Sequence, residues 1–179
     1  MTEAYKIGYG GPDSQFWSMY GGRVYVTTGP VERWIDGVRY EMVTTMSNGR
    51  LVCDRLIIDR KDQDGNETGP PVNSAAIRAV NITQWLRSAV EFFVSEPVPG
   101  EPDKFTKRHV WPPEDFAKNG PTDEALDQMA QHYAWLQVHG YRPSGAFLEV
   151  YDIPRPTTSK WIAMARKKGI LSDEHRREG

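Results

Sequence analysis

The C-terminal stretch 142–171, RPSGAFLEVYDIPRPTTSKWIAMARKKGIL, decides how this chain folds. Pro143 favours the start of a short helix that runs to Tyr151, because a proline in the first turn gives up no helical hydrogen bond. A tight turn with two prolines follows, and a second helix is expected over about 157–168. Gly169 then ends that helix, since glycine readily adopts the left-handed conformation of a helix C-terminus. We therefore predict two short helices joined by a tight turn.

A third helix is predicted just upstream, so the C-terminal part is expected to be trihelical. Thr122 supplies a capping hydroxyl, and two acids follow it in the first turn, where the helix dipole favours negative charge. Gly140 ends this helix. Residues predicted to pack between the two later helices are Ala146, Phe147, Val150, Ile153, Thr158, Trp161 and Ile162.

Polar and cationic residues are predicted at the exposed start of the second short helix. In a helix-turn-helix this end enters the DNA major groove, where Arg and Lys donate to guanine and Ser or Thr contact base or phosphate. Cations elsewhere on the trihelical part suit phosphate contacts. The predicted base-reading residues are Arg155, Thr157, Ser159 and Lys160, and the predicted phosphate-binding residues are Arg142, Arg166, Lys167 and Lys168.

The same stretch resembles a helix-turn-helix segment of proteins from actinobacteria and their phages. The shared pattern is T-x-S-x-W-I followed by A-R-x-x-G-x-L, which here occupies Thr157–Ile162 and Ala165–Leu171. The resemblance implies a site-specific DNA-binding regulator of transcription. Two positions depart from the pattern: Leu148 stands where a small Ala is common, and Asp152 stands where the turn often has Gly. The stretch 49–90 is also similar to a strand–loop–helix that precedes such modules in actinobacterial proteins.

The charge distribution agrees with a DNA-binding C-terminus. The whole chain of 179 residues has a formal net charge of −2, but 142–179 contains eight Lys/Arg and five Asp/Glu. A basic end on an acidic body is typical of a DNA-reading module joined to another domain.

The N-terminal part is predicted to be β-rich. Strand-like runs cover 23–28, 39–45 and 51–59, and a strand is possible over 5–9. Asn48-Gly49 predicts a hairpin turn, because both residues accept positive φ.

Helices are expected to follow these strands. Ser74 can cap a short helix, and Asn81 or Thr83 can cap a longer one that ends near Val94. The predicted fold is α+β, with a β-rich domain at 1–95, a proline-rich linker at 96–119 and the helix-turn-helix domain with its charged tail at 120–179.

Motifs for other functions are weak. The one cysteine, Cys53, excludes an internal disulfide and is interpreted as a small buried strand residue. The four histidines lack a metal-binding spacing, and no nucleophile motif or phosphate-binding glycine loop is present. We therefore expect no enzyme, no cofactor and no metal. No signal peptide or membrane span is apparent, which favours the cytoplasm.

Two questions stay open at this point. The β-rich domain could form a homodimer, sense a ligand or bind another protein, and a dimer would suit half-sites one DNA turn apart. The helical module could also belong to a phage-type packaging or assembly component, or serve as a protein-interaction module.

Overall fold

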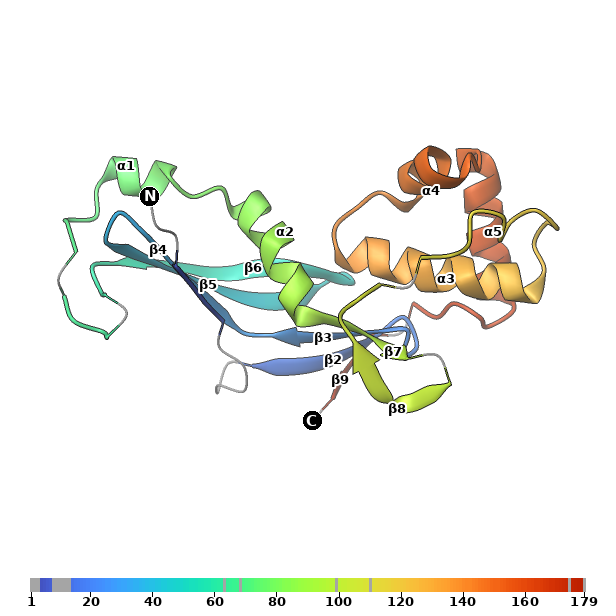
Figure 1. Cartoon of the computed structure of the whole chain (residues 1–179), viewed down its shortest axis with the longest axis horizontal. Coiled ribbons are helices and arrows are strands. Elements are labelled where there is room, and N and C mark those ends of the chain that lie inside the picture. Colours follow the sequence, from blue (N-terminus) through green and yellow to red (C-terminus); the bar gives the residue numbers. More distant parts are fainter. Residues whose placement is uncertain are drawn as a thin grey trace. The chain divides into compact units, whose positions relative to one another are not determined.

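A computed structural model describes residues 4–7, 14–62, 64–67, 69–98, 100–109, 111–173 and 175–178. The fold is mixed α+β, with a β-rich N-terminal part and a helical C-terminal part (Figure 1). The chain divides into two compact units, which are described separately. The N-terminal unit comprises Met1–Phe16 and Thr27–Phe93 with Gly179, and the C-terminal unit comprises Trp17–Val26 and Val94–Glu178. The predicted boundary at residue 95 therefore misses one segment, because 17–26 belongs to the C-terminal unit.

An antiparallel sheet is the centre of the N-terminal unit, with strand order β1-β4-β5-β6. The strands are β1 (Ala4–Ile7), β4 (Pro30–Ile35), β5 (Val38–Ser47) and β6 (Arg50–Asp59). The strands predicted over 39–45 and 51–59 are confirmed. The hairpin between them is confirmed too, since Asn48 and Gly49 have φ of 49° and 72°, as a two-residue turn with positive φ at both positions requires.

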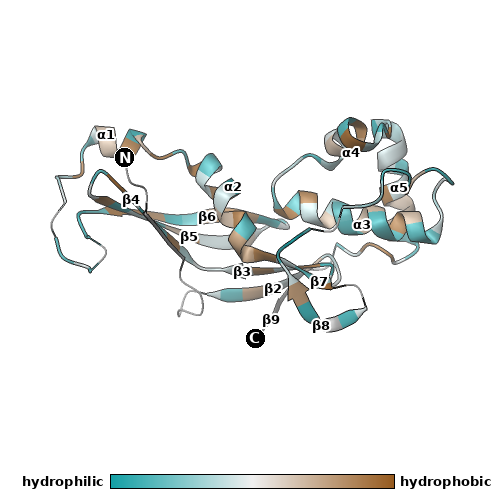
Figure 2. Ribbon diagram, viewed as in Figure 1, coloured by the Kyte–Doolittle hydropathy of each residue, from teal (hydrophilic) through white to brown (hydrophobic). Residues whose placement is uncertain are grey.

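Two helices follow this sheet: α1 (Ser74–Arg78) and α2 (Ile82–Phe93), which packs on β6. Hydrophobic and hydrophilic residues are interspersed along α2 (Figure 2), and the side of α2 that is buried carries Trp85, Ala89, Val90 and Phe93. Asn73 caps α1 through its side-chain oxygen, one residue before the predicted Ser74. Asn81 caps α2 by accepting from the Gln84 N–H. Cys53 on β6 is only half-buried, and burial raises the pKa of its thiol.

The second sheet has the strand order β8-β7-β3-β2-β9. Its strands are β2 (Gln15–Met19), β3 (Val24–Thr28), β7 (Val94–Val98), β8 (Glu101–Thr106) and β9 (His175–Glu178). The hairpin of β7 and β8 occupies the start of 96–119, so this part of the segment is not the linker that its prolines indicate. Prolines are tolerated at sheet edges and at bulges. Strand β8 is an edge strand, and the register of its pairing with β7 shifts between Pro97 and Val98, so the prolines do not prevent this hairpin.

The segment 17–26 is held in the C-terminal unit by Arg23. The Arg23 guanidinium donates to the Ile170 carbonyl at 3.0 and 2.6 Å and pairs with Asp127 at 2.6 Å. In return, Gln131 Nε2 donates to the Arg23 carbonyl at 2.8 Å. Strand β3 also pairs with β7, with Tyr25 opposite Ser95. This unit is therefore assembled from two parts of the chain far apart in sequence.

The helices of the C-terminal unit are α3 (Asp123–Val138), α4 (Pro143–Tyr151) and α5 (Arg155–Lys167), and each contacts the other two. The predicted Thr122 cap is confirmed, because its hydroxyl accepts from the Ala125 N–H at 3.1 Å. Gly140 and Gly169 have φ of 74° and 70° after α3 and α5, as expected. The buried residues of this helical core include Leu126, Met129, Ala130, Phe147, Ile153, Thr158, Trp161, Ile162 and Ala165.

Helix α4 packs differently from the prediction at one position. Phe147 is fully buried, but Val150 is 51% exposed. The inner face of this nine-residue helix follows the four-residue spacing of Pro143, Phe147 and Tyr151. Val150 lies off that face, and so it does not pack between the helices as predicted.

The turn between α4 and α5 depends on Asp152, which has φ 52° and ψ 29°. Its N–H donates to the Leu148 carbonyl, and the Ile153 N–H donates to the Phe147 carbonyl, so the last carbonyls of α4 are satisfied. The positive φ expected at this turn is present.

Replacing Asp152 by glycine is expected to raise the free energy of unfolding by about 0.5 kcal/mol, because glycine carries no Cβ penalty in the left-handed region. Chemical denaturation of the two proteins measures the difference. Asp152→Ala is the matched comparison and is expected to be the least stable of the three. If Asp152→Gly proved less stable than the unchanged protein, the Asp152 side chain would have to make a stabilising contact that outweighs the strain of its positive φ.

Candidate functional site

The exposed face of α5 carries cations and small residues. Thr158, Trp161, Ile162 and Ala165 are buried on the opposite face. The exposed residues are Arg155, Pro156, Ser159, Lys160, Ala163, Arg166 and Lys167. No residue of α5 is acidic. The face that α5 presents to solvent is therefore positive or neutral along its whole length.

Cations and small residues share the middle of this face. At 100° per residue, Pro156 and Lys167 lie opposite the buried stripe, Lys160 and Ala163 flank them, and Ser159 lies farther to one side. Arg155 stands at the first position of the helix. Within the described ranges, none of these three cations takes part in an ion pair. Arg155, Lys160 and Lys167 are therefore exposed cations that pair with no carboxylate of the described residues.

Thr157, which the sequence predicts as a base-reading residue, lies apart from the other three. It is half-buried and lines a cavity of about 460 Å³ together with Glu114, Asp115 and Asp152. Thr157 thus lies on a side of α5 that faces carboxylates of neighbouring segments. Arg155, Ser159 and Lys160 are the predicted residues that share the exposed side.

Two predicted phosphate-binding cations are engaged within the protein. Arg166 forms a two-point ion pair with Asp173 at 2.8 and 2.9 Å and donates to the Tyr133 hydroxyl at 3.2 Å. The hydrogen bonds that Arg166 donates to the Asp173 carboxylate are the main cause of the raised pKa of Arg166. Lys168 pairs with Asp123 at the start of α3. These contacts fix the end of α5 against α3. Arg142 is exposed at the position before α4, so it stays available.

Sequence reasoning missed a buried polar chain in this unit. Glu96 on β7 shares a hydrogen bond of 2.5 Å with His109 Nδ1, and His109 Nε2 shares one of 2.7 Å with His132 Nδ1 on α3. Their exposures are 3%, 8% and 0%. In the described part of the chain, His132 Nε2 has no partner. Burial and the neighbouring His109 lower the pKa of His132 to about 3, so this imidazole is neutral at pH 7.

Aromatic rings enclose the two histidines. Trp135 stacks on His109 with ring centroids 4.5 Å apart. Phe147 and Tyr151 of α4 meet the His132 ring edge-on at 5.2 and 5.8 Å. The series of hydrogen bonds Glu96–His109–His132 therefore ends at the rings of α4, the helix that precedes the α4–α5 turn. Nothing among the described residues groups three metal-ligating side chains in a metal-binding geometry.

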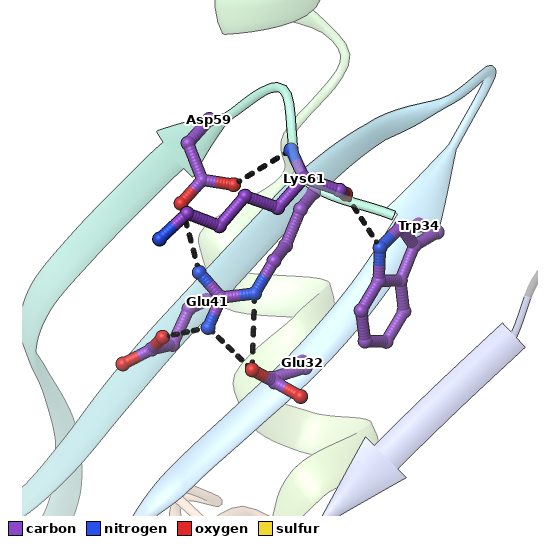
Figure 3. Close-up of polar contacts among 6 residues, drawn as sticks. Glu32, Trp34, Glu41, Asp59 and Lys61 are labelled. Carbon is purple, nitrogen blue, oxygen red and sulfur yellow. Dashed lines mark hydrogen bonds and ion pairs between the residues drawn. The ribbon is translucent and has the colours of Figure 1, made fainter. Parts of the chain in front are cut away.

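A second polar cluster lies on the sheet of the N-terminal unit (Figure 3). Glu32, Glu41 and Asp59 come from β4, β5 and β6 and all pair with the Arg39 guanidinium, Asp59 at 2.9 Å. Arg39 is 13% exposed and its partners 15–26%. The raised pKa of Arg39 reflects hydrogen bonding to Glu32 and the nearby carboxylates, which outweigh the opposing effect of burial. The cluster cross-links three neighbouring strands of one sheet, which indicates a structural role.

Comparison with known proteins finds no match to a protein-family model, to a curated protein or to a solved structure. Among the described residues, no helix is both long and apolar enough to cross a bilayer.

Proposed function

We propose that this protein binds double-stranded DNA in a sequence-specific way through α5 and regulates transcription, with α4 and α5 acting as a helix-turn-helix. The observation that carries the proposal is the exposed face of α5, which has uncommitted cations with small residues beside them and no carboxylate. A face of this kind complements a polyanion, and residues 142–179 as a whole are basic.

The composition of this face suits a helix that enters a groove. The major groove of B-DNA is about 12 Å wide and admits an α-helix. Lys160 and Lys167 lie near the middle of the face, and the short side chains of Ser159 and Ala163 beside them leave the α5 backbone room to approach base edges. The three-residue turn between α4 and the start of α5, which satisfies the last carbonyls of α4, holds α5 at a fixed angle.

Within this proposal the predicted residues take different roles. Arg155, Ser159 and Lys160 are proposed to read bases, and Lys167 and Arg142 to contact phosphates. Arg166 and Lys168 act as positioning residues, because their internal ion pairs orient α5. Thr157 is half-buried beside the turn. We propose that it contacts the DNA backbone and not the bases.

A protein-interaction role, including one in a phage-type assembly, is the second candidate. Leu148 and Val150 on α4 are 39% and 51% exposed. Two exposed apolar side chains on one short helix could form part of a contiguous apolar patch, and such patches mark surfaces that bind other proteins. A homodimer that doubles the DNA contacts would also need such a surface.

Binding of a fluorescent duplex, followed by anisotropy at several salt concentrations, tests the proposal. We expect the logarithm of the affinity to fall linearly with the logarithm of salt, and Lys167→Ala to reduce that slope by about one. Lys160→Ala is expected to lower the preference for the selected site about tenfold over random duplex. Lys104→Ala, in which the lost lysine is 68% exposed on β8, is the matched control and should change neither quantity.

Two results would overturn the proposal. The first is an absence of duplex binding even at low salt. The second is an equal loss of affinity in Lys104→Ala and Lys167→Ala, which would mean that general charge, rather than α5, attracts the duplex.

A further inference from the structure

The C-terminal unit contains a cavity of about 430 Å³ next to the buried polar chain. Trp111 and the pair Pro112–Pro113 contribute apolar walls, and Glu96, Asp127 and Gln128 contribute polar groups. The volume is within the range of small-molecule sites, about 300–1,000 Å³. No Lys, Arg or His is among the described residues that line it.

Hydrogen-bond acceptors without donors dominate the polar part of this lining. Gln128 Oε1 is buried and has no partner in the described ranges. Among the described residues, Glu96 is hydrogen-bonded through one oxygen, to His109 Nδ1. Gln131, which also lines the cavity, already donates its amide N–H to the Arg23 carbonyl. A buried acceptor that lacks a donor is destabilising, so the cavity is suited to a ligand that supplies donors.

We propose that this cavity binds an alkylammonium group, carried either by a small organic amine or by a lysine side chain of another protein. An ammonium group has three donors and no acceptor, which complements the Glu96 carboxylate and Gln128 Oε1. The alkyl chain would lie against the prolines, and the Trp111 ring, in a residue that is 52% exposed, offers a face that attracts cations. The proposal does not depend on DNA binding.

The buried polar chain gives this site a fixed anion. Glu96 is 3% exposed and is held by His109, which His132 holds in turn. The carboxylate is therefore oriented before any ligand arrives, and little side-chain freedom is lost on binding. Asp127 differs, since it already pairs with Arg23 at 2.6 Å. Glu96 and Gln128 are thus the residues whose loss should weaken binding most.

Titration of the full-length protein with n-butylammonium chloride tests the proposal. The readout is the indole N–H signal of Trp111 in a nitrogen–proton correlation spectrum, assigned by its loss in Trp111→Phe. We expect a saturable shift with butylammonium and none with 1-butanol at the same pH and ionic strength. Gln128→Leu and Glu96→Gln are each expected to weaken binding about tenfold. Glu124→Gln, which removes an exposed charge from the same helix, is the control and should leave the affinity unchanged.

Further arms separate the sources of the amine and protect the test from misfolding. Tighter binding of Nα-acetyl-lysine-N-methylamide than of butylammonium supports a lysine side chain, whereas its exclusion while butylammonium binds supports a free amine. Gln128→Leu removes an unpaired acceptor, so this variant should fold normally even if Glu96→Gln does not. Equal shifts with butanol, or unchanged affinity in folded Gln128→Leu, would overturn the proposal.

Discussion

Replacing Arg39 by methionine is expected to lower the free energy of unfolding of the N-terminal unit by about 3–5 kcal/mol. Arg39 is the shared partner of Glu32, Glu41 and Asp59, and all four side chains are largely buried. Methionine fills a similar volume but leaves three neighbouring carboxylates without a counter-charge. The cost therefore arises mainly from the uncompensated anions that remain and less from the loss of one favourable contact.

Urea denaturation at pH 7 measures this effect, with Arg87→Met as the control. Arg87 is exposed on α2, so its replacement removes the same charge from the same unit at little cost. The deficit of Arg39→Met should shrink as the pH falls and the carboxylates become neutral. A deficit below about 1 kcal/mol, as found for exposed ion pairs, would show that solvent already screens the cluster.

Acidification from pH 7 to pH 4.5 is expected to destabilise the C-terminal unit by about 4 kcal/mol through two histidines. Burial lowers the pKa of His132 to about 3 and that of His139 to about 4, against an ordinary value of 6.5. Between pH 4.5 and 6.5 the unfolded chain therefore binds protons that the folded unit does not. Stability falls as the pH falls through this window, and it is fully present above pH 6.5.

The slope of unfolding free energy against pH isolates each histidine. His132→Leu is expected to reduce the slope between pH 4.5 and 6 by about 1.4 kcal/mol per pH unit. This variant also leaves His109 without its partner, so it should be less stable at every pH, and only the slope is diagnostic. His139→Phe should reduce the slope by a similar amount while it keeps the stacking on Trp135, whose ring centroid lies 3.8 Å from that of His139. Imidazole signals of His132 or His139 that titrate near pH 6.5 in the folded protein would contradict this account.

Local features of the fold could be predicted because their causes are local. The Asn48-Gly49 hairpin, the Thr122 cap and the glycines after α3 and α5 each depend on residues within a few positions of one another. The same holds for the positive φ of Asp152. The α+β class, with a β-rich N-terminal part and helices in the C-terminal part, follows from these signals.

Proline content misled the prediction for 96–119. Counting prolines favours a linker, but it does not reveal whether a strand lies at a sheet edge. Strand β8 takes an edge position in the sheet, and the irregular pairing at Pro97 accommodates the missing N–H. The position of a strand in its sheet depends on residues elsewhere in the chain, so no local pattern could reveal it.

The contacts that define the polar chain were beyond prediction for the same reason. His109 lies 13 residues from Glu96 and 23 from His132, and neither spacing matches a helical or strand period. Arg166 and Lys168 look like free cations at a helix end, yet Lys168 pairs with Asp123, 45 residues away. The sequence indicates which cations exist on α5, whereas the structure shows which of them are committed.

The two-part assembly of the C-terminal unit has a consequence for the synthesis of the chain. Tyr25 pairs with a residue 70 positions later, and Arg23 bonds to a carbonyl 147 positions later. During synthesis, the strand edges of segment 17–26 therefore stay unpaired until β7 has been made, and Arg23 lacks its acceptor until Ile170 has been made. Unpaired strand edges and long-range pairing favour aggregation during slow folding. In a fragment that begins at residue 94, β7 would lack its neighbouring strand β3. Addition of residues 17–26 as a separate peptide should supply that strand and restore the pairing.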